Sequence, residues 1–200
     1  MLLGGAPLAE ARGAVVLLHG RGGSAQEMLA LARELDRPLL AYFAPEAAGR
    51  QWYPYSLLEK VEKNQSHLNS AVRLLKTILG KIEAAKVPFE RVALVGFSQG
   101  GCLALEFAAR NPRRYGAVAA LSAALLGPEG TPRDYAGGLD GTPVFLGCGD
   151  VDALVPKRRV DETAGVFGRL GANVTKRFFP GLGHAIHPEE IEVVRGMLAW

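Results

Sequence analysis

The chain has few cysteines and no long apolar run. Its two cysteines, Cys102 and Cys148, fit neither a disulfide framework nor a metal-binding spacing, so we expect buried free thiols. The N-terminal segment lacks the basic region and the apolar stretch of a secretory signal, and no apolar run reaches the length of a membrane-spanning helix. These absences predict a cytoplasmic protein with no stable membrane insertion.

An excess of charge of one sign is also lacking. The formal net charge is only +3. Basic residues gather in two short groups, Arg110 with Arg113 and Arg114, and Lys157–Arg159, which we expect as solvated faces at helix ends. The sequence therefore argues against a nucleic-acid partner. It contains no clustered His and Cys set and no phosphate-binding loop, so no metal and no other cofactor is expected. The oligomeric state stays open, a homodimer included.

Apolar runs alternate with helical patterns along the chain. Strands are expected at Ala14–Leu18, Leu39–Ala44, Arg91–Val95, Ala117–Leu121, Pro143–Cys148 and Asn173–Phe179. Helices are expected from Ser24 to Asp36, from Leu57 to Lys86 with a candidate break at Asn64–Ser66, over Cys102–Arg110, from Lys157 to Leu170 and from Pro188 onward. The alternation predicts a single α/β domain over residues 1–200, with a mainly parallel sheet of six to seven strands and helices on both faces.

The motif Gly96–Gly101 joins an expected strand directly to an expected helix. Gly-x-Ser-x-Gly in that context is typical of a nucleophile elbow, in which a sharp turn presents the serine at the end of a sheet. Small residues must flank the serine because its backbone is strained and a neighbouring Cβ would collide. The motif predicts Ser98 as a nucleophile if the chain also supplies a base, an acid and oxyanion donors.

Four histidines are available as the base. His67 falls within an expected helix, and His19 falls in a glycine loop that precedes the nucleophile. His184 follows the last expected strand in a glycine turn that can aim an imidazole across the end of the sheet. We favour His184, with His187 as the alternative, although His187 could instead cap the final helix.

The acid and the oxyanion donors are expected in two other loops that follow strands. Asp152 is favoured as the acid that orients the base, with Asp150 as structural support at the tip of the strand. The resulting order Ser–Asp–His is that of the α/β-hydrolases. The backbone N–H groups of Gln99 and Arg21 are the expected oxyanion donors. The Arg21 side chain is expected either in solvent or against an acidic group of the substrate.

Four segments carry a resemblance to a known family: Leu18–Gly22, Gly96–Gly101, Gly149–Pro156 and Gly183–His184. Together they resemble the phospholipase/carboxylesterase family of α/β-hydrolases, which includes acyl-protein thioesterases. The resemblance implies a small serine esterase without a cap domain, with Ser98, Asp152 and His184 as its triad. Thioesterase members have an apolar residue where Arg21 stands and a different segment at Gln51–Tyr55, so the acyl preference does not carry over.

The expected function is hydrolysis of carboxylic esters of small to medium acyl chains through an acyl-enzyme. The segment 123–141 is too short for a cap domain, which favours an open site and small-molecule ester substrates. Aromatic residues in the loop 45–56 either line this site or cover the edge of the core. The residues expected in its apolar wall are Trp52, Tyr53, Leu125 and Val155. The alternatives are an acyl-thioesterase or lysophospholipase on the same triad and, more remotely, a non-catalytic binding protein.

Overall fold

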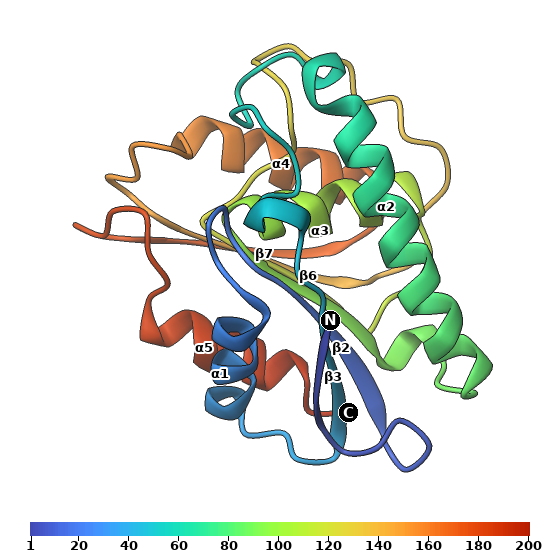
Figure 1. Ribbon diagram of the computed structural model, residues 1–200. Helices are drawn as coiled ribbons and strands as arrows, with labels where there is room; N and C mark the ends of the chain where they lie inside the picture. The colour runs from blue at the N-terminus through green and yellow to red at the C-terminus, as the bar shows by residue number, and fades with distance from the viewer.

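The computed structural model describes all 200 residues and contains one seven-stranded sheet (Figure 1). The strands are β1 (Leu2–Gly5), β2 (Gly13–Leu18), β3 (Leu40–Ala44), β4 (Val92–Phe97), β5 (Ala117–Leu121), β6 (Pro143–Gly149) and β7 (Asn173–Phe179). Their order across the sheet is β1-β3-β2-β4-β5-β6-β7. Every neighbouring pair is parallel except β1 and β3. The predicted fold class, with a mainly parallel sheet and no separate cap domain, is confirmed.

Five α-helices cover the two faces of the sheet. They are α1 (Ala25–Leu35), α2 (Val61–Ala84), α3 (Gln99–Arg110), α4 (Lys157–Arg169) and α5 (Pro188–Met197). Helices α2, α3 and α4 pack on one face and α1 and α5 on the other, so the sheet separates two apolar layers (Figure 1). Short 3₁₀ turns at Ala48–Arg50 and Phe89–Arg91 complete the regular structure. None of the helices is long and apolar enough to cross a bilayer.

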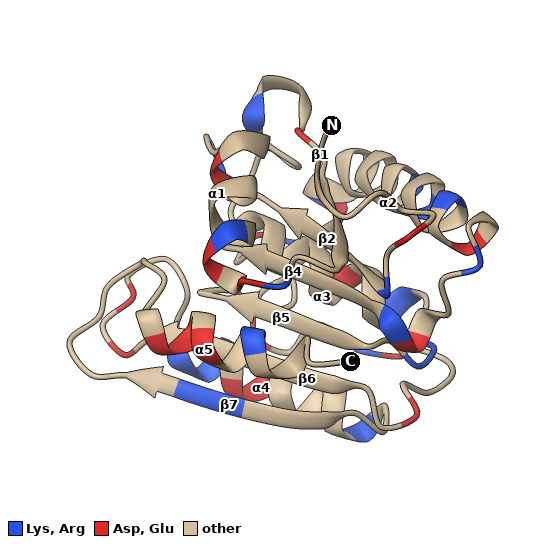
Figure 2. Ribbon diagram, turned by 90° about the horizontal axis from the view of Figure 1, so that it is seen from below, with Lys and Arg blue, Asp and Glu red and all other residues tan.

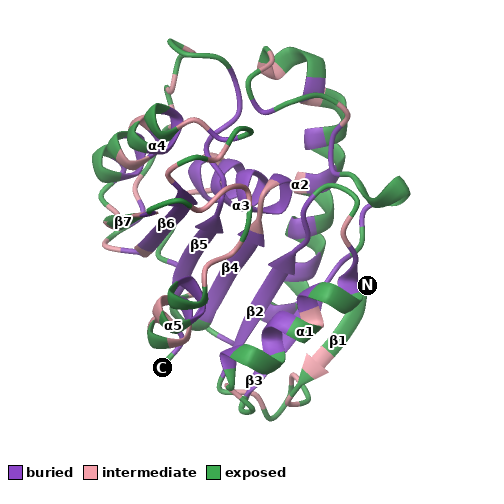
Figure 3. Cartoon of the chain, turned by 90° about the vertical axis from the view of Figure 1, so that its left-hand side faces the viewer, coloured by how far each residue is buried: buried purple, intermediate pink, exposed green.

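The central strands form the core because both of their faces are covered. Strands β2, β4, β5 and β6 carry no Lys, Arg, Asp or Glu, whereas such residues lie interspersed on the helices, on the loops and on β7 (Figure 2). The same four strands are almost entirely buried (Figure 3). Continuous apolar runs of this kind are expected for parallel strands between two helical layers.

The structure departs from the sequence expectation at α2 and adds two local features, at β1 and at α1. Strand β1 was not expected from the sequence; it is a short edge strand that pairs with β3. Helix α2 starts at Val61 and runs without a break, because Asn64 is buried there and binds the loop at Tyr55 and Ser56. At α1 a capping box forms between Ser24 and Glu27, an arrangement that stabilises a helix by about 1 kcal/mol.

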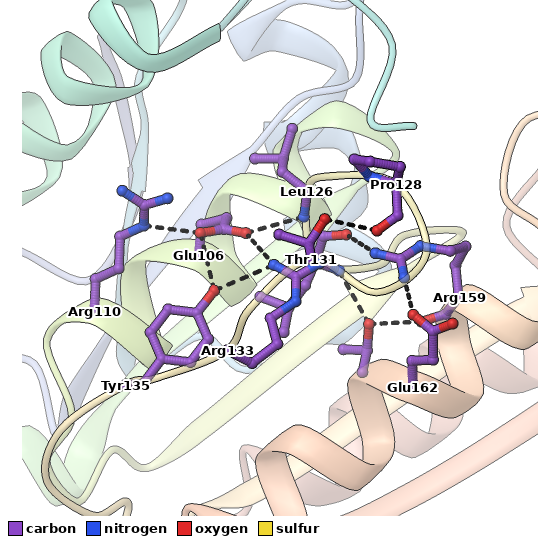
Figure 4. A network of polar contacts seen from close by, with 11 residues as sticks. Glu106, Arg110, Leu126, Pro128, Thr131, Arg133, Tyr135, Arg159 and Glu162 are labelled. Atoms are coloured by element: carbon purple, nitrogen blue, oxygen red, sulfur yellow. Dashed lines mark hydrogen bonds and ion pairs between the residues drawn. The ribbon is translucent and has the colours of Figure 1, made fainter. Parts of the chain in front are cut away.

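The segment after β5, residues 122–142, folds against α3 instead of forming a cap. The fully buried carboxylate of Glu106 on α3 holds this segment (Figure 4). It accepts hydrogen bonds from Leu126 N at 2.9 Å, from Arg110 Nε at 2.8 Å and from Tyr135 Oη at 3.3 Å. A buried carboxylate is tolerated only with such partners. The loop is therefore held close to the helix, and the carboxyl ends of the strands stay open.

Candidate active site

Ser98 occupies a strained turn between β4 and α3. Its backbone has φ 51° and ψ −120°, a conformation that L-residues rarely adopt. Ser98 N donates to Leu121 O at 2.8 Å, and Ser98 O accepts from Cys102 N at 2.9 Å. Strain of this kind costs about 1–3 kcal/mol and persists only where the surroundings fix it. The hydroxyl therefore stands at the carboxyl end of the sheet in a fixed direction.

Two glycines of the motif allow the close approach that this turn requires. A Cβ on Gly96 would lie 2.4 Å from the carbonyl carbon of Gly100, and a Cβ on Gly100 would lie 2.1 Å from Leu18 O. Both distances are shorter than any real contact. Helix α3 can begin directly against the ends of β2 and β4 only because these side chains are absent.

His184 and Asp152 complete a hydrogen-bonded chain with Ser98. His184 Nε2 lies 2.7 Å from Ser98 Oγ, and His184 Nδ1 lies 2.7 Å from Asp152 Oδ2. A carboxylate only accepts, so Nδ1 carries the proton and Nε2 is free to accept from the serine hydroxyl. The other oxygen, Asp152 Oδ1, accepts from Leu154 N at 2.8 Å and Val155 N at 3.0 Å. The three side chains come from the loops after β4, β6 and β7.

The surroundings of Asp152 keep it ionised. Burial raises the pKa of this carboxyl, but the hydrogen bonds from His184, Leu154 and Val155 outweigh burial and leave the pKa below its ordinary value. Cys148 Sγ lies 3.7 Å from Asp152 Oδ2, and burial, followed by this carboxylate, raises the pKa of the thiol to about 12. Cys148 is therefore a neutral neighbour of the carboxylate. Both cysteines are free and buried, as expected.

The other candidates for base and acid lie elsewhere. Asp150 Oδ1 accepts from Gly181 N at 2.7 Å and fixes the turn that precedes His184. His187 caps α5, where its Nδ1 accepts from Glu189 N at 3.2 Å. His19 is buried and accepts from Ala47 N through Nε2, and His67 is exposed on α2. Of the four histidines, only His184 lies within hydrogen-bond distance of Ser98.

The two expected oxyanion donors lie in segments that adjoin Ser98. Gln99 is the first residue of α3, so its N–H has no acceptor within the helix. Arg21 N makes no hydrogen bond to another backbone group. The loop of Arg21 touches the elbow, since a Cβ on Gly20 would lie 3.3 Å from Ser98 Cβ. Both N–H groups remain available to a ligand.

The Arg21 side chain is not free in solvent, and its contact with an acidic group of the substrate stays a prediction. Although the residue is exposed, its guanidinium is bound to the loop Gln51–Tyr55. Nη1 donates to Gln51 Oε1 at 2.7 Å and to Pro54 O at 3.0 Å, and Nη2 donates to Tyr53 O and Tyr55 O, both at 3.1 Å. The Gln99 side chain holds the same loop, since its Oε1 accepts from Trp52 N and its Nε2 donates to Tyr53 O, both at 2.7 Å.

A cleft of about 460 Å³ opens beside Ser98 and His184. Tyr53 and Val155 line it, as expected. Trp52 and Leu125 do not, which corrects the expectation for those two residues. Trp52 is buried and donates from Nε1 to His19 O at 2.9 Å, so it covers the core edge. Leu125 is drawn into the core because Thr163 and Arg159 bind its backbone.

The wall of the cleft includes residues beyond the four expected in it. Phe97, Tyr55, Leu57 and Leu154 also line it, and the Phe97 ring lies 5.2 Å from the His184 ring. Leu154 and Tyr55 are 58% and 50% exposed, so the mouth is apolar but open. Phe97 lies within the serine motif, and Leu154 lies two residues after Asp152. Their closeness in sequence to catalytic candidates could have indicated that they line the site.

A mainly parallel sheet with serine, acid and histidine on the loops after β4, β6 and β7 defines an α/β-hydrolase. A family model described as phospholipase/carboxylesterase matches residues 6–200. The chain belongs to that family. The family confirms the resemblance seen in the sequence and the expectation of a hydrolase that acts on ester bonds.

Particular relatives agree with this assignment. The crystal structure of a phospholipase/carboxylesterase from Dyadobacter fermentans is 38% identical and superposes with a TM-score of 0.94, covering 100% of this chain and 95% of that one. Acyl-protein thioesterase 1 of Saccharomyces cerevisiae is 28% identical over 94% of this chain and 92% of its own length. Acyl-protein thioesterase 1 of Gibberella zeae is 35% identical, but the alignment covers 59% of this chain and only 51% of that relative.

Proposed function

We propose that the protein is a serine carboxylesterase that hydrolyses carboxylic esters of small to medium acyl chains through an acyl-enzyme. The observation that carries the proposal is the chain of two 2.7 Å contacts from Ser98 through His184 to Asp152. A serine hydroxyl is a weak nucleophile unless a base lies within hydrogen-bond distance and a third group orients that base. Both conditions are met at the mouth of the cleft.

In the first half of the reaction His184 Nε2 takes the Ser98 proton while Oγ attacks the acyl carbon. Asp152 stabilises the imidazolium that forms and holds its tautomer. The Arg21 and Gln99 N–H groups bind the negative oxygen of the tetrahedral intermediate. The alcohol then leaves with the proton from His184, and the acyl group remains on Oγ.

In the second half water replaces the alcohol. His184 removes a proton from the water, which attacks the acyl carbon, and the same two N–H groups bind the second oxyanion. Ser98 leaves with the proton from His184 and the carboxylic acid is released. The atoms and protons of both half-reactions are accounted for by the substrate, water and these residues.

The size preference rests on the shape of the site. No cap covers the cleft. Its volume is about 460 Å³, and its lining contains apolar side chains together with Ser98 and His184. A short acyl chain can be buried there, whereas a long chain would extend past the exposed Leu154 and Tyr55. We expect kcat/KM to be highest for short or medium p-nitrophenyl esters and to fall for the palmitate ester.

The test of the proposal is hydrolysis of p-nitrophenyl butyrate by purified wild type and Ser98→Ala. Wild type should turn over the ester, and the variant should lose at least about 10³-fold in kcat. A variant that folds and retains wild-type turnover would refute Ser98 as the nucleophile. A palmitate ester that gives the highest kcat/KM would refute only the size preference.

An acyl-thioesterase on the same triad is the second candidate, and the acyl-protein thioesterase relatives favour it. Oxygen esters and thioesters form the same acyl-enzyme, so the geometry of the triad does not distinguish them. A matched pair of substrates does, namely an octanoyl oxygen ester and an octanoyl thioester. The carboxylesterase proposal expects the higher kcat/KM for the oxygen ester, and the opposite ranking favours the thioesterase.

A further inference from the structure

A second cavity, of about 270 Å³, lies between the segment after β5 and helix α4. It shares no residue with the cleft at Ser98. Leu125, Arg159, Thr163 and Val166 form its buried base. Gly130 and Arg169 are exposed at its rim, so a small solute can reach the interior.

Two arginines in this cavity have buried N–H groups without a partner. Arg159 is 2% exposed; its Nη1 pairs with Glu162 and its Nη2 donates to Leu125 O at 3.1 Å, but Nε donates to nothing. The Arg133 side chain is 11% exposed; its Nη1 donates to Tyr135 Oη at 3.4 Å, and Nη2 has no acceptor. Arg133 and Arg159 line the cavity together with Thr131, and Figure 4 shows the three side chains. Buried donors without partners are rare in folded proteins, and each calls for an explanation such as a bound ion or water.

The charges around the cavity do not balance. Three arginines, Arg133, Arg159 and Arg169, line it together with a single carboxylate, Glu162. Behind it, the nearest oxygen of Glu106 to Arg133 is 3.6 Å away, and the same carboxylate already binds Arg110, Leu126 and Tyr135. Burial, and then repulsion by Arg133 and Arg158, lowers the pKa of Arg159. A water molecule would accept the free N–H groups but would leave the excess positive charge.

We propose that this cavity binds a small multiply charged oxyanion, a phosphate group in particular, through Arg133 Nη2 and Arg159 Nε, with Arg169 at the rim. Guanidinium groups bind phosphate and carboxylate oxygens by charge-assisted hydrogen bonds, and a tetrahedral dianion can accept from several donors at once. The site is separate from the esterase cleft and does not depend on the function proposed for it.

Isothermal titration with inorganic phosphate at constant ionic strength tests the proposal. Wild type should bind one phosphate, with no heat from the same ionic strength of sodium chloride. Arg133→Lys keeps the charge but removes Nη2, and it should weaken binding about tenfold, since one charge-assisted hydrogen bond is lost. Glu162→Gln removes the one carboxylate of the lining and should strengthen binding. Two changes with opposite effects cannot both arise from damage to the fold.

The matched control is Arg33→Gln, on α1 at the opposite face of the sheet, which removes one exposed positive charge far from the cavity. It should bind phosphate as wild type does. Equal weakening by Arg33→Gln and Arg133→Lys would show non-specific attraction and overturn the proposal, as would the absence of binding to wild type.

A selenate soak of crystals grown without phosphate locates the anion. The expected result is an anomalous peak for a selenate whose oxygens lie within hydrogen-bond distance of Arg133 Nη2 and Arg159 Nε. A water molecule in that place, with no anomalous signal at saturating selenate, would contradict the proposal. Citrate in a parallel titration distinguishes the two oxyanion classes: tighter binding of citrate than of phosphate would overturn the assignment to a phosphate group.

Discussion

Arg21 and Gln99 donate to the same carbonyl oxygen, that of Tyr53. The Arg21 Nη2 contact measures 3.1 Å and the Gln99 Nε2 contact 2.7 Å. These are also the two residues whose backbone N–H groups are the expected oxyanion donors. The loop Gln51–Tyr55 therefore links the two expected oxyanion donors to one wall of the cleft, and we expect the two side chains to position these backbone groups.

Replacement of Arg21 by Met tests this link. Arg21→Met keeps the length and the backbone N–H but removes four hydrogen bonds to the loop. We expect kcat for p-nitrophenyl butyrate to fall about tenfold, with a smaller change in KM, because a misplaced donor weakens transition-state binding most. Gln51→Leu removes only one of the four contacts and should lower kcat less than threefold, by about 0.5 kcal/mol. Equal kcat values for wild type and Arg21→Met would show that the side chain does not position the donor.

Asp152 and Asp150 can be separated by matched amide substitutions. Asp152→Asn places an amide beside His184 Nδ1 and favours the wrong tautomer, so kcat should fall on the order of 10³–10⁴-fold at neutral pH. Asp150→Asn leaves an oxygen that can still accept from Gly181 N, so its loss should be less than about tenfold. The measurement is kcat/KM on one short ester for both variants. The assignment of the acid fails if Asp150→Asn is the more damaged enzyme.

The glycine at the start of α3 should be irreplaceable. A Cβ on Gly100 would lie 2.1 Å from Leu18 O, a backbone atom that cannot move without the strand. We expect Gly100→Ala to lower the free energy of unfolding by more than about 3 kcal/mol in urea denaturation. Gly80→Ala, within α2, is the control: no atom lies within 4 Å of its Cβ, so it should be neutral or stabilising by up to about 1 kcal/mol. Similar stabilities for the two variants would contradict the packing described.

Glu190 makes stability depend on pH near neutrality. Burial raises its pKa from 4.5 to about 7, against the opposing hydrogen bond from His187 N. Its Oε1 is buried without a partner, and the neighbouring Cys148 thiol has a pKa of about 12 and stays neutral. Between pH 4.5 and 7 the folded state holds more protons than the unfolded state, so the free energy of unfolding falls as pH rises through this window.

Glu190→Gln should remove that dependence. At pH 8 the variant should be more stable than wild type by on the order of 2 kcal/mol, and the difference should vanish below about pH 4.5, where both side chains are neutral. Glu192→Gln, on an exposed residue of the same helix, should show no such pH-dependent gain. The measurement is urea unfolding of the three proteins at pH 4 and pH 8. A difference that stays constant with pH would contradict a raised pKa at Glu190.

The sheet could be predicted from the sequence because its central strands are continuous apolar runs. Strand β1 could not, because two of its four residues are glycines and its pairing with β3 is what makes it a strand. Similarly, the candidate break at Asn64–Ser66 is absent because the buried Asn64 amide binds the loop at Tyr55 rather than its own helix.

The arrangement of Ser98, His184 and Asp152 could be expected because each follows a parallel strand, and such strand ends meet at one edge. The role of the Arg21 side chain could not be expected. The Arg21 guanidinium donates mostly to backbone carbonyls. Because every residue carries a carbonyl, no residue type in the sequence indicates these contacts. Leu125 was misplaced for the same reason: side chains of Thr163 and Arg159 fix its backbone and turn it away from the cleft.

The central claim is that Ser98 is the nucleophile of a working triad, and covalent labelling tests it most directly. Purified protein is treated with a fluorophosphonate and the modified peptide is identified by mass spectrometry. The account predicts one adduct on the peptide that contains Ser98, with loss of esterase activity in proportion to labelling, and slow or no labelling of His184→Ala. An adduct on another residue, or full ester hydrolysis by protein that is completely labelled at Ser98, would contradict it.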